Sequence, residues 1–394
     1  MISVSFMTAN VGSSSIKLDG FADADGLNRV FALSLTGIGQ QNGKLVIKTS
    51  DDKQSRELET GDQDQALNLV LQELDRLVDR AGLQAIGHRL VHGGPELTGP
   101  VVITDKTVAG LEDLAVYDPD HTPAALGMIR ALAKRYDGIK QVACFDTAFF
   151  HNIPRVAQII AVPRKYQSLG LRRYGFHGLS YTYLQSAFRR VAGDAAADGR
   201  VIYAHLGSGA SLAATAGGQP VDMTMGFSPA SGVVMSSRSG DLDPGVFDFL
   251  HRQGGLELKD ISHMVNKESG LLGVSGKTAD MLALLHAQTS DEAAAEAVEL
   301  FCYSIRKAIG ALASTIGGLD SLIFAGGIGE QSPEIRRRIC EGLEYLGIGL
   351  DESANSRHAG LISAPGSRAG VHVLATDEAV VICRQTADVT EDNQ

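Results

Sequence analysis

Two short stretches of the same build decide the fold: TANVGSSSIKL at residues 8–18 and AHLGSGASLAA at residues 204–214. In each stretch, a loop of small residues connects an apolar strand to a second strand. Glycine lets the backbone turn sharply and approach an anion closely, and serine hydroxyls add hydrogen-bond donors. The repetition predicts two similar domains, each with a loop that can hold phosphate. The alternative is a pair of ordinary hairpin turns.

Helices and strands alternate after each opening. In the first half, strands are expected at 30–35, 44–48, 85–91 and 141–145, with helices at 64–80 and 124–134. In the second half, strands are expected at 201–205, 211–215, 219–222, 322–325 and 371–375, with helices at 291–316, at 333–345 and from residue 377. This order predicts an α/β protein of two duplicated domains, residues 1–148 with 380–394 and residues 149–379.

Composition narrows the class of protein. The chain has 394 residues, 44% hydrophobic and 21% charged, which excludes wholesale disorder. Its net charge of −11 provides no basic excess for coating nucleic acid. No signal peptide and no apolar run long enough to span a membrane are recognisable, so we expect a cytoplasmic protein. The four cysteines, Cys144, Cys302, Cys340 and Cys383, lie far apart and are expected to be reduced thiols rather than zinc ligands or a redox pair.

Several charged residues stand where a ligand could be held. Arg89 lies in GHRLVHGG and Arg238 in SSRSGDLDPG, and an arginine beside glycines can present its planar fork to phosphate or carboxylate. Asp146 follows a strand, His177 lies in YGFHGLS, and Glu378 begins the last helix. Each has a purely structural alternative: a surface salt bridge for the arginines, a helix cap for Asp146, a structural role for His177, and a helix-dipole partner for Glu378.

Two further motifs are rejected as ligand sites, and a third is more informative. GLLGVSGKT at residues 270–278 nearly matches a Walker A loop, but Leu271 occupies the place of the first glycine, so we reject it. His88 and His92 lie on a strand and not on a helix, which argues against a metal pair. IFAGGIGEQSPEIRRRI at residues 323–339 reads as a buried strand, a glycine turn with room for a flat ring, and a helix that begins at Ser332 and Pro333.

The motifs NVGSSSIK, GHRLVHGG, FDTAFF, RRYGFHG, HLGSGAS, MTMGFSPASG, SRSGDLDPG, FAGGIGE and TDEAV occur one after another over about residues 4–384. In this order the chain resembles the acetate/propionate kinase family of the actin, sugar kinase and Hsp70 superfamily. The resemblance implies two ribonuclease-H-like (actin-like ATPase) domains with a cleft between them. It also implies reversible phosphoryl transfer between ATP and a short carboxylate, a requirement for Mg²⁺ or Mn²⁺, a homodimer, and neither nucleic acid nor a membrane as partner.

The same resemblance implies roles for residues at matching positions. The magnesium site comprises Asn10 and Glu378. The transferred phosphoryl group is flanked by Asp146, Arg89, Arg238, His121 and His177. Phosphates of ATP are held by Ser13, Ser15 and Lys17 and by His205, Leu206, Gly207, Ser208 and Gly209. The adenosine pocket comprises Gly326, Gly327, Ile328 and Gly329. The acyl group lies against Val91, Phe176 and Pro229, with Arg89 on the carboxylate.

The chain departs from the family pattern at a few of these places. Asp120 stands where an apolar wall of the acyl pocket is expected, and Thr122 and Ser208 each replace an asparagine. Tyr181 replaces a histidine, and serines replace Gly-Thr before Arg238. The charged residues of the family motifs are all present, so the expected reaction type is unchanged. The departures leave undecided which acid is the substrate. Acetate is the first expectation and propionate or another short acid the alternative. A remoter one is a non-metabolic actin-like ATPase.

Overall fold

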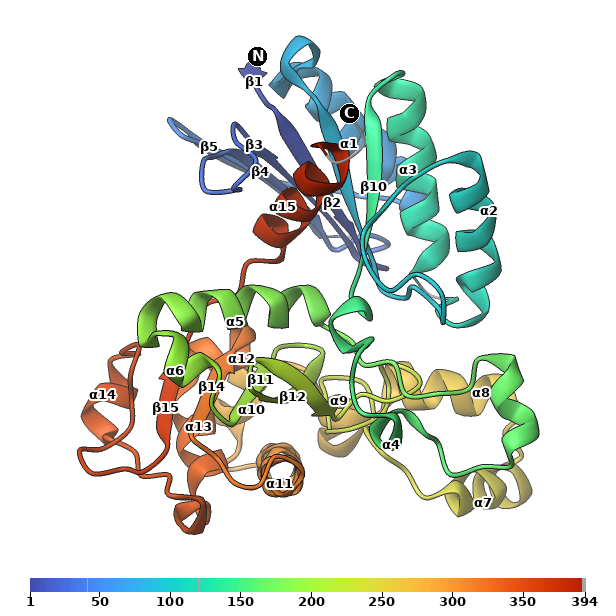
Figure 1. Cartoon of the computed structure of the whole chain (residues 1–394). Coiled ribbons are helices and arrows are strands. Elements are labelled where there is room, and N and C mark those ends of the chain that lie inside the picture. The colour runs from blue at the N-terminus through green and yellow to red at the C-terminus, as the bar shows by residue number, and fades with distance from the viewer. Residues whose placement is uncertain (41, 120, 392–394) are drawn as a thin grey trace. The chain divides into compact units, whose positions relative to one another are not determined.

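The computed structural model describes residues 1–40, 42–119 and 121–391, so that Asp120 lies outside the described residues. The chain divides into two compact units. Unit 1 comprises Met1–Phe149, Gly178–Tyr183 and Asp377–Gln394, and unit 2 comprises Phe150–His177 and Leu184–Thr376. Figure 1 shows the C-terminal helix returning to the unit that contains the N-terminus. The predicted domain ranges differ from this division chiefly at residues 178–183, and they stay a prediction.

Unit 1 is built on an eight-stranded sheet in the order β6-β5-β4-β3-β2-β8-β10-β9. Its strands are β2 (Phe6–Val11), β3 (Ser15–Phe21), β4 (Arg29–Thr36), β5 (Gly43–Thr49), β6 (Lys53–Leu58), β8 (Ala85–Leu90), β9 (Val101–Val102) and β10 (Lys140–Phe145). Strands β2 to β6 form an antiparallel meander, whereas β8 runs parallel to both β2 and β10. A separate two-stranded sheet joins β1 (Ile2–Ser3) to β7 (Val78–Asp79).

Helices cover both faces of the unit 1 sheet because its strands alternate apolar side chains between the two faces. On one face, Met7 of β2 packs in a core with residues of α1 (Gln63–Leu77) and α3 (Thr122–Arg135). On the other, Phe6 packs in a cluster with residues of α15 (Glu378–Glu391). Further helical segments of this unit are α2 (Asp105–Asp113), η1 (Arg80–Gly82) and η2 (Leu114–Val116).

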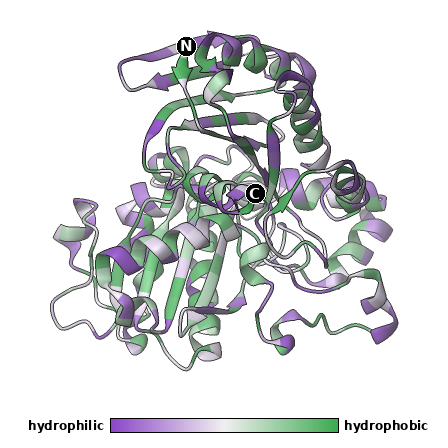
Figure 2. Cartoon of the chain, turned by 45° about the horizontal axis from the view of Figure 1, so that its top comes forward, coloured by the Kyte–Doolittle hydropathy of each residue, from purple (hydrophilic) through white to green (hydrophobic). Residues whose placement is uncertain are grey.

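Unit 2 is built on a five-stranded sheet in the order β13-β12-β11-β14-β15. Its strands are β11 (Val201–Leu206), β12 (Ala210–Ala216), β13 (Gln219–Met223), β14 (Ser321–Ala325) and β15 (Gly370–Val373). Each residue of β14 is buried, and in Figure 2 the strands of this sheet are largely green, as expected for a sheet covered on both faces. The longest helix is α11 (Glu292–Thr315).

Helix α5 (Gly178–Ala192) spans both units, because its first six residues belong to unit 1. The other helical segments that follow β10 and precede α15 are, apart from α11, shorter than α5. They are η3 (Ala148–Phe150), which spans the division, α4 (Arg155–Gln158), η4 (Arg164–Leu169), α6 (Asp194–Ala197), α7 (Pro244–Gly254), α8 (Leu258–His263), η5 (Met264–Glu268), α9 (Gly270–Ser275), α10 (Met281–Ala287), α12 (Gly326–Gln331), α13 (Pro333–Cys340), η6 (Glu344–Leu346) and α14 (Glu352–Ser356).

The two sheets share one strand order. In unit 1, β4-β3-β2 form an antiparallel run that continues into the parallel pair β8 and β10. In unit 2, β13-β12-β11 form the same antiparallel run and continue into the parallel pair β14 and β15. The duplication predicted from the two glycine–serine openings is therefore confirmed at the level of topology, because each opening is the β2–β3 or the β11–β12 turn.

The predicted elements are present, with differences at their ends and several omissions. The helix predicted over 333–345 ends at Cys340, because Glu341 is extended and Gly342 has a φ of +85°. The structure also contains α2, α5 and β6, which were not predicted from the sequence. GLLGVSGKT forms α9 rather than a phosphate loop after a strand, which confirms its rejection.

The structure also bears on two expectations drawn from the composition, one about membrane-spanning segments and one about the cysteines. No helix within the described residues is both long enough and apolar enough to cross a membrane. All four cysteines are buried and free, and burial raises the pKa of the Cys144 thiol to about 12. They are therefore packed as small apolar side chains, and not paired as disulfides.

Candidate active site

Arg89 and Asp146 meet at the carboxyl end of two neighbouring strands in unit 1. Strands β8 and β10 are parallel and in register, with Leu90 opposite Phe145, so the residues at their ends lie side by side. Arg89 donates from Nη2 and Nε to Oδ2 of Asp146, at 2.6 and 3.1 Å. Asp146 is fully buried, and its backbone oxygen accepts a hydrogen bond from the N–H of Gly178 at 2.9 Å.

Asn10 and Glu378 complete this group. Arg89 Nη1 donates to Oδ1 of Asn10 at 3.1 Å, and Asn10 Nδ2 donates to Oε2 of Glu378 at 3.3 Å. Glu378 Oε2 lies 3.9 Å from Arg89 Nε. Burial alone lowers the pKa of Arg89, but the carboxylates of Asp146 and Glu378 outweigh burial and raise it above its usual range. The guanidinium is thus a permanent cation, tied to β2, to the end of β10 and to the start of α15.

The oxygen atoms of Asn10, Asp146 and Glu378 form a donor set of the kind that Mg²⁺ prefers. The residues that the structure describes include no complete cage of three or more acidic, His or Cys side chains. Mg²⁺ does not need one, because it is commonly bound by one or two carboxylates together with substrate phosphates and water. The Arg89 cluster also contains more carboxylates than cations, since Asp118 acts on Arg89 as well. These residues fit a divalent cation.

The first glycine–serine loop lies at the end of the same strand β2. Gly12 N–H donates to the carbonyl of Ser15 at 2.8 Å, which closes the turn between β2 and β3. Ser13 and Lys17 are exposed and Ser15 is partly buried. Ser13 also lines a cavity of about 380 Å³ beside the starts of α1 and α3. Of the three residues predicted for the first phosphate loop, Ser13 lies on the turn itself, and Ser15 and Lys17 lie on the first part of β3.

His121 and Val91 also belong to unit 1. His121 is the residue before α3, and its Nδ1 lies 2.7 Å from Oδ1 of Asp118. Thr122 begins the helix and is buried. Val91 follows β8 directly and is buried.

In unit 2, His177 is held in a strained conformation. It has a φ of +60°, in the left-handed region that few non-glycine residues adopt. Its ring stacks on that of His205, with 4.4 Å between centroids, and its Nδ1 lies 2.8 Å from Oγ of Ser211. Local strain of this kind is costly and concentrates at functional sites, where surrounding contacts hold it in place. His177 immediately precedes Gly178 in the chain.

The second glycine–serine loop draws Arg238 toward the same histidine. A Cβ on Gly209 would lie 3.2 Å from His177 Nε2 and 3.6 Å from Arg238 Nη2, so the absence of a side chain leaves room between them. Arg238 Nη1 donates to the carbonyl of Pro229 at 2.8 Å. The loop closes through Gly207 N–H to Gly209 O at 3.0 Å, and the carbonyl of Ser208 accepts from Ser236 at 3.2 Å.

The glycine turn after β14 packs against this loop. Gly326 has a φ of +76°, and a Cβ there would lie 2.8 Å from the carbonyl oxygen of Leu206. Gly327, by contrast, faces open space, since a Cβ there would meet nothing within 4 Å. A Cβ on Gly329 would lie 3.6 Å from the Cβ of Leu206, and Ile328 lies between Gly327 and Gly329 on α12. Gly327 is exposed, and the adenosine pocket at this turn stays a prediction.

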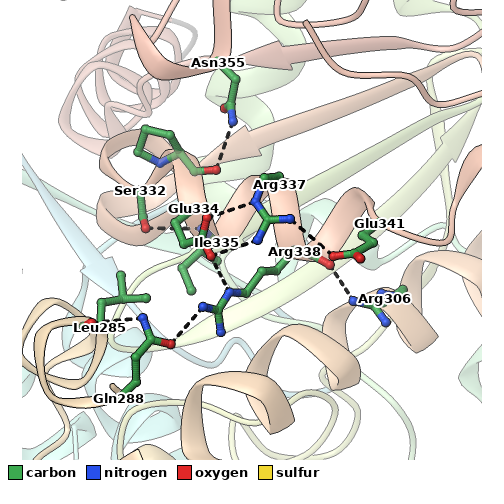
Figure 3. A network of polar contacts seen from close by, with 11 residues as sticks. Leu285, Gln288, Arg306, Ser332, Glu334, Ile335, Arg337, Arg338, Glu341 and Asn355 are labelled. Atoms are coloured by element: carbon green, nitrogen blue, oxygen red, sulfur yellow. Dashed lines mark hydrogen bonds and ion pairs between the residues drawn. The ribbon is translucent and has the colours of Figure 1, made fainter. Parts of the chain in front are cut away.

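Helix α13 supports the glycine turn from behind. Arg336 is fully buried and donates to the carbonyls of Gly329 and Glu330 at 2.8 and 2.9 Å, and burial lowers its pKa to about 10. Figure 3 shows the polar network around the same helix, in which Glu334 accepts hydrogen bonds from Arg337 and Arg338. The buried cation of Arg336 therefore holds the glycine turn in place, and an ion-pair network stabilises α13.

The structure brings the predicted residues together as two groups. Unit 1 unites Asn10, Arg89, Asp146 and Glu378, and unit 2 unites His177, His205, Gly209, Arg238 and Pro229. Phe176, the residue before His177, is buried. Asp118 and Ser211, which contact the predicted histidines, were not predicted from the sequence. Asp118 lies three residues before His121, a spacing that was visible, whereas Ser211 is distant from His177 in sequence.

The fold and these residues define a class. Two duplicated ribonuclease-H-like α/β domains make this an actin-like ATPase-type protein with glycine–serine loops and charged residues at the strand ends. A family model described as the acetokinase family matches residues 5–384, and the chain belongs to that family.

Individual relatives agree over nearly the whole chain. A protein named acetate kinase from Rhodopseudomonas palustris (strain TIE-1) is 42% identical, with 96% of each chain covered. The solved structure of a propionate kinase from Francisella tularensis subsp. tularensis SCHU S4 is similar with a TM-score of 0.90 at 31% identity, covering 98% of this chain and 100% of that one. The crystal structure of Porphyromonas gingivalis acetate kinase gives 0.87 at 34% identity, covering 98% and 99%.

Proposed function

We propose that this protein catalyses the reversible phosphorylation of acetate by ATP, giving acetyl phosphate and ADP by direct in-line transfer. One observation carries the proposal: a permanently charged arginine, Arg89, held between Asp146, Glu378 and Asn10 at the carboxyl ends of parallel strands. In open α/β sheets, ligands bind at that edge. Family membership and the names of the relatives support the same reaction.

The chemistry asks little of the protein beyond position and charge. A carboxylate is ionised at pH 7, so it can attack the γ-phosphorus without a general base. The new bond joins a carboxylate oxygen to phosphorus, the bond to the β–γ bridging oxygen breaks, and ADP leaves with that oxygen. No proton moves. Catalysis then consists of alignment and of offsetting charge on the phosphoryl oxygens.

The arginines are the residues best suited to that task. Arg89 and Arg238 each present a planar set of donors that matches carboxylate and phosphate oxygens. Arg89 is fixed by Asp146, and Arg238 by the carbonyl of Pro229, so neither needs to reorganise when charge develops. We assign His177 and His121 to donate further hydrogen bonds to the phosphoryl oxygens.

Asn10, Glu378 and Asp146 would hold Mg²⁺, or Mn²⁺ in its place, together with phosphate oxygens of the nucleotide. When bound, the ion supplies positive charge that offsets the negative charge of the phosphates. The residues of the chain do the remaining work: Asn10 and Glu378 fix the orientation of Arg89, and Asp146 sets its position by accepting two of its hydrogen bonds.

For ATP, we assign the phosphates to two loops and the adenosine to a third. Ser13, Ser15 and Lys17 would bind from the first loop, and His205 to Gly209 from the second. The adenosine would lie at Gly327, where the backbone faces open space between Gly326 and Gly329. Glycine at that position lets a flat ring approach the main chain.

For the acid, we assign Val91, Phe176 and Pro229 to the acyl group. Propionate is the second candidate substrate, favoured by the similarity to a solved propionate kinase. One methylene group in an apolar pocket is worth only about 1–3 kcal/mol, so we expect acetate and propionate both to be phosphorylated.

We further propose a cytoplasmic homodimer. Four free thiols are in keeping with a reducing compartment. Light scattering tests the oligomeric state independently of activity. A mass of one chain would contradict the dimer without affecting the proposed reaction.

The test of the reaction is to trap the product with hydroxylamine, which converts an acyl phosphate to a hydroxamate. The protein is incubated with ATP, Mg²⁺ and acetate, propionate or butyrate, and both hydroxamate and ADP are measured. We expect equal amounts of the two products with acetate. ADP without hydroxamate from any acid would overturn the kinase and favour an actin-like ATPase.

A further inference from the structure

A buried carboxylate stands behind His121. Asp118 is only 4% exposed, and its Oδ1 lies 2.7 Å from Nδ1 of His121, which is 21% exposed. The imidazole therefore has one nitrogen turned to a buried anion, and its other nitrogen, Nε2, is not part of this contact. The pair stands at the start of α3, in the same unit as the Arg89 group.

The contact with Asp118 selects one form of the ring. A carboxylate only accepts hydrogen bonds, so at this distance Nδ1 must carry the proton and donate it. Free neutral histidine can place its single proton on either nitrogen, and the partner of one nitrogen decides the state of the other. Asp118 thus fixes both the orientation of the ring and the protonation of Nδ1.

The second oxygen of Asp118 has no structural partner within the part of the chain that the structure describes. Its Oδ2 is buried and has no hydrogen-bond partner among the described residues. A buried polar atom without a partner costs about 1–3 kcal/mol, so a position that served the fold alone would favour a neutral or apolar side chain. A carboxylate here is better explained by the electrostatic work it does on its neighbours.

Its neighbours are the imidazole of His121 and the guanidinium of Arg89. Burial lowers the pKa of Arg89, whereas Asp146, Glu378 and also Asp118 raise it, so the charge of Asp118 reaches the Arg89 group. Arg89 on β8 is thus a charged group that the charge of Asp118 reaches, and Asp146 after β10 and Glu378 on α15 are bound to Arg89.

We propose that Asp118 is a positioning residue that keeps Nδ1 of His121 protonated and directs its Nε2 toward the transferred phosphoryl group. This inference rests on the proposed phosphoryl transfer. In the complex with substrates, the ring has the Asp118 carboxylate on one side and the phosphoryl group on the other. Only a ring with a proton on each nitrogen can donate to both anions at once, so this role requires the ring to carry a second proton, on Nε2, in that complex.

A double-mutant cycle tests whether Asp118 acts through His121. The variants are D118A, H121A and the double variant, with D113N as the control, because Asp113 is exposed at the end of α2. Removing the partner that orients a metal-bound histidine typically costs about 10- to 100-fold, and we use that range by analogy. We expect D118A to lower kcat by that factor, with the KM for ATP little changed, and D113N to leave kcat unchanged. In the H121A background, D118A should have a much smaller effect, limited to its influence on Arg89.

The isosteric variant D118N separates orientation from charge. An asparagine oxygen can still accept from Nδ1–H, but it carries no negative charge. We expect D118N to lower kcat less than D118A and to leave the melting temperature closer to that of the wild type. Equal and full activity of D118N and D118A would overturn the proposal, as would an undiminished effect of D118A in the H121A background.

A measurement on the wild-type protein does not depend on any variant folding. Nitrogen NMR of the ¹⁵N-labelled full chain, with His121 assigned by comparison with H121A, reports which ring nitrogen carries the proton. We expect protonated Nδ1. A ring protonated on Nε2 alone would overturn the inference, whatever the kinetics. If wild-type protein forms no acyl phosphate while Nδ1 is protonated, the proposed function fails and the positioning of the ring stands.

Discussion

The guanidinium of Arg89 donates two hydrogen bonds to one oxygen of Asp146, 2.6 Å from Nη2 and 3.1 Å from Nε. Because both residues stand at the ends of neighbouring parallel strands, the sheet itself sets their separation. The remaining terminal nitrogen of Arg89 donates to Asn10. A cation and its counter-charges are thus in place before any substrate binds, which is the arrangement that electrostatic stabilisation of a transition state requires.

Removing Arg89 should therefore cost catalysis much more than it costs the fold. We expect R89A to lower kcat by roughly 10²–10³, the effect of losing one preorganised donor. Hydroxamate formation measures the rate. The matched control is R130A, which removes an exposed arginine of α3 in the same unit and should leave the rate unchanged. Normal turnover in R89A would exclude this guanidinium from the transition state.

Asp146→Asn replaces a buried carboxylate with an amide of the same shape. Because Asp146 holds Arg89 and contributes to the proposed cation site, we expect D146N to fold and to lose most of its activity. Circular dichroism reports the fold, and hydroxamate formation is measured over a series of Mg²⁺ concentrations. D137N, at an exposed position after α3, is the control. Full recovery of the rate in excess Mg²⁺ would reduce Asp146 to a residue that merely recruits the ion.

Two neighbouring glycines give opposite expectations. Alanine at Gly326 would face both a φ of +76° and the Leu206 carbonyl at 2.8 Å, so we expect G326A to lower the melting temperature, at a cost of about 1–3 kcal/mol. Alanine at Gly327 meets nothing within 4 Å, so G327A should melt like the wild type.

If the space at Gly327 receives the adenosine, G327A should still raise the KM for ATP several-fold while the KM for acetate stays the same. An unchanged KM for ATP would remove Gly327 from the nucleotide site.

His88 predicts how stability depends on pH. Burial lowers its pKa from 6.5 to about 4, and its Nε2 lies 2.6 Å from Oε1 of Gln141. The unfolded chain takes up a proton near pH 6.5 and the folded chain only near pH 4. Stability is therefore lost as the pH falls through that window, by about 3 kcal/mol for this single group.

Urea unfolding of wild type and H88Q at pH 7 and at pH 4 measures this contribution. We expect H88Q to lose less stability than the wild type between the two values, whereas H251Q, at an exposed histidine, should behave like the wild type. A wild-type curve that is flat between pH 7 and pH 4 would contradict the burial of a neutral imidazole.

The sequence predicted those parts of the molecule in which local pattern and tertiary structure agree. Strands β8 and β10 are apolar runs that end at a glycine turn or at Asp146, and both were visible. Helix α5 was missed because aromatic, β-branched and serine residues fill its first turns and because it begins after His177 with no side-chain cap. Strand β6 carries almost no buried residues, so it had no apolar pattern to detect.

The residues of the candidate site could be predicted from the sequence, but the contacts between them could not. The motifs selected Arg89, Asp146, Asn10 and Glu378, yet the hydrogen bonds that unite them join segments up to 368 positions apart. Partners such as Ser211 lie within an ordinary strand and become visible only when the sheet has formed. Asp118 precedes a helix at a common spacing, and its burial is a property of the folded chain alone.

The central claim is that a carboxylate oxygen attacks the γ-phosphorus of ATP. Acetate labelled with ¹⁸O in both carboxyl oxygens tests it most directly. The protein is supplied with labelled acetate, ATP, Mg²⁺ and hydroxylamine, which attacks the carbonyl carbon of the acyl phosphate and releases inorganic phosphate. We predict that each phosphate released carries one ¹⁸O atom derived from the acid. Phosphate without the label would mean that water attacked ATP, and the proposed transfer would be wrong.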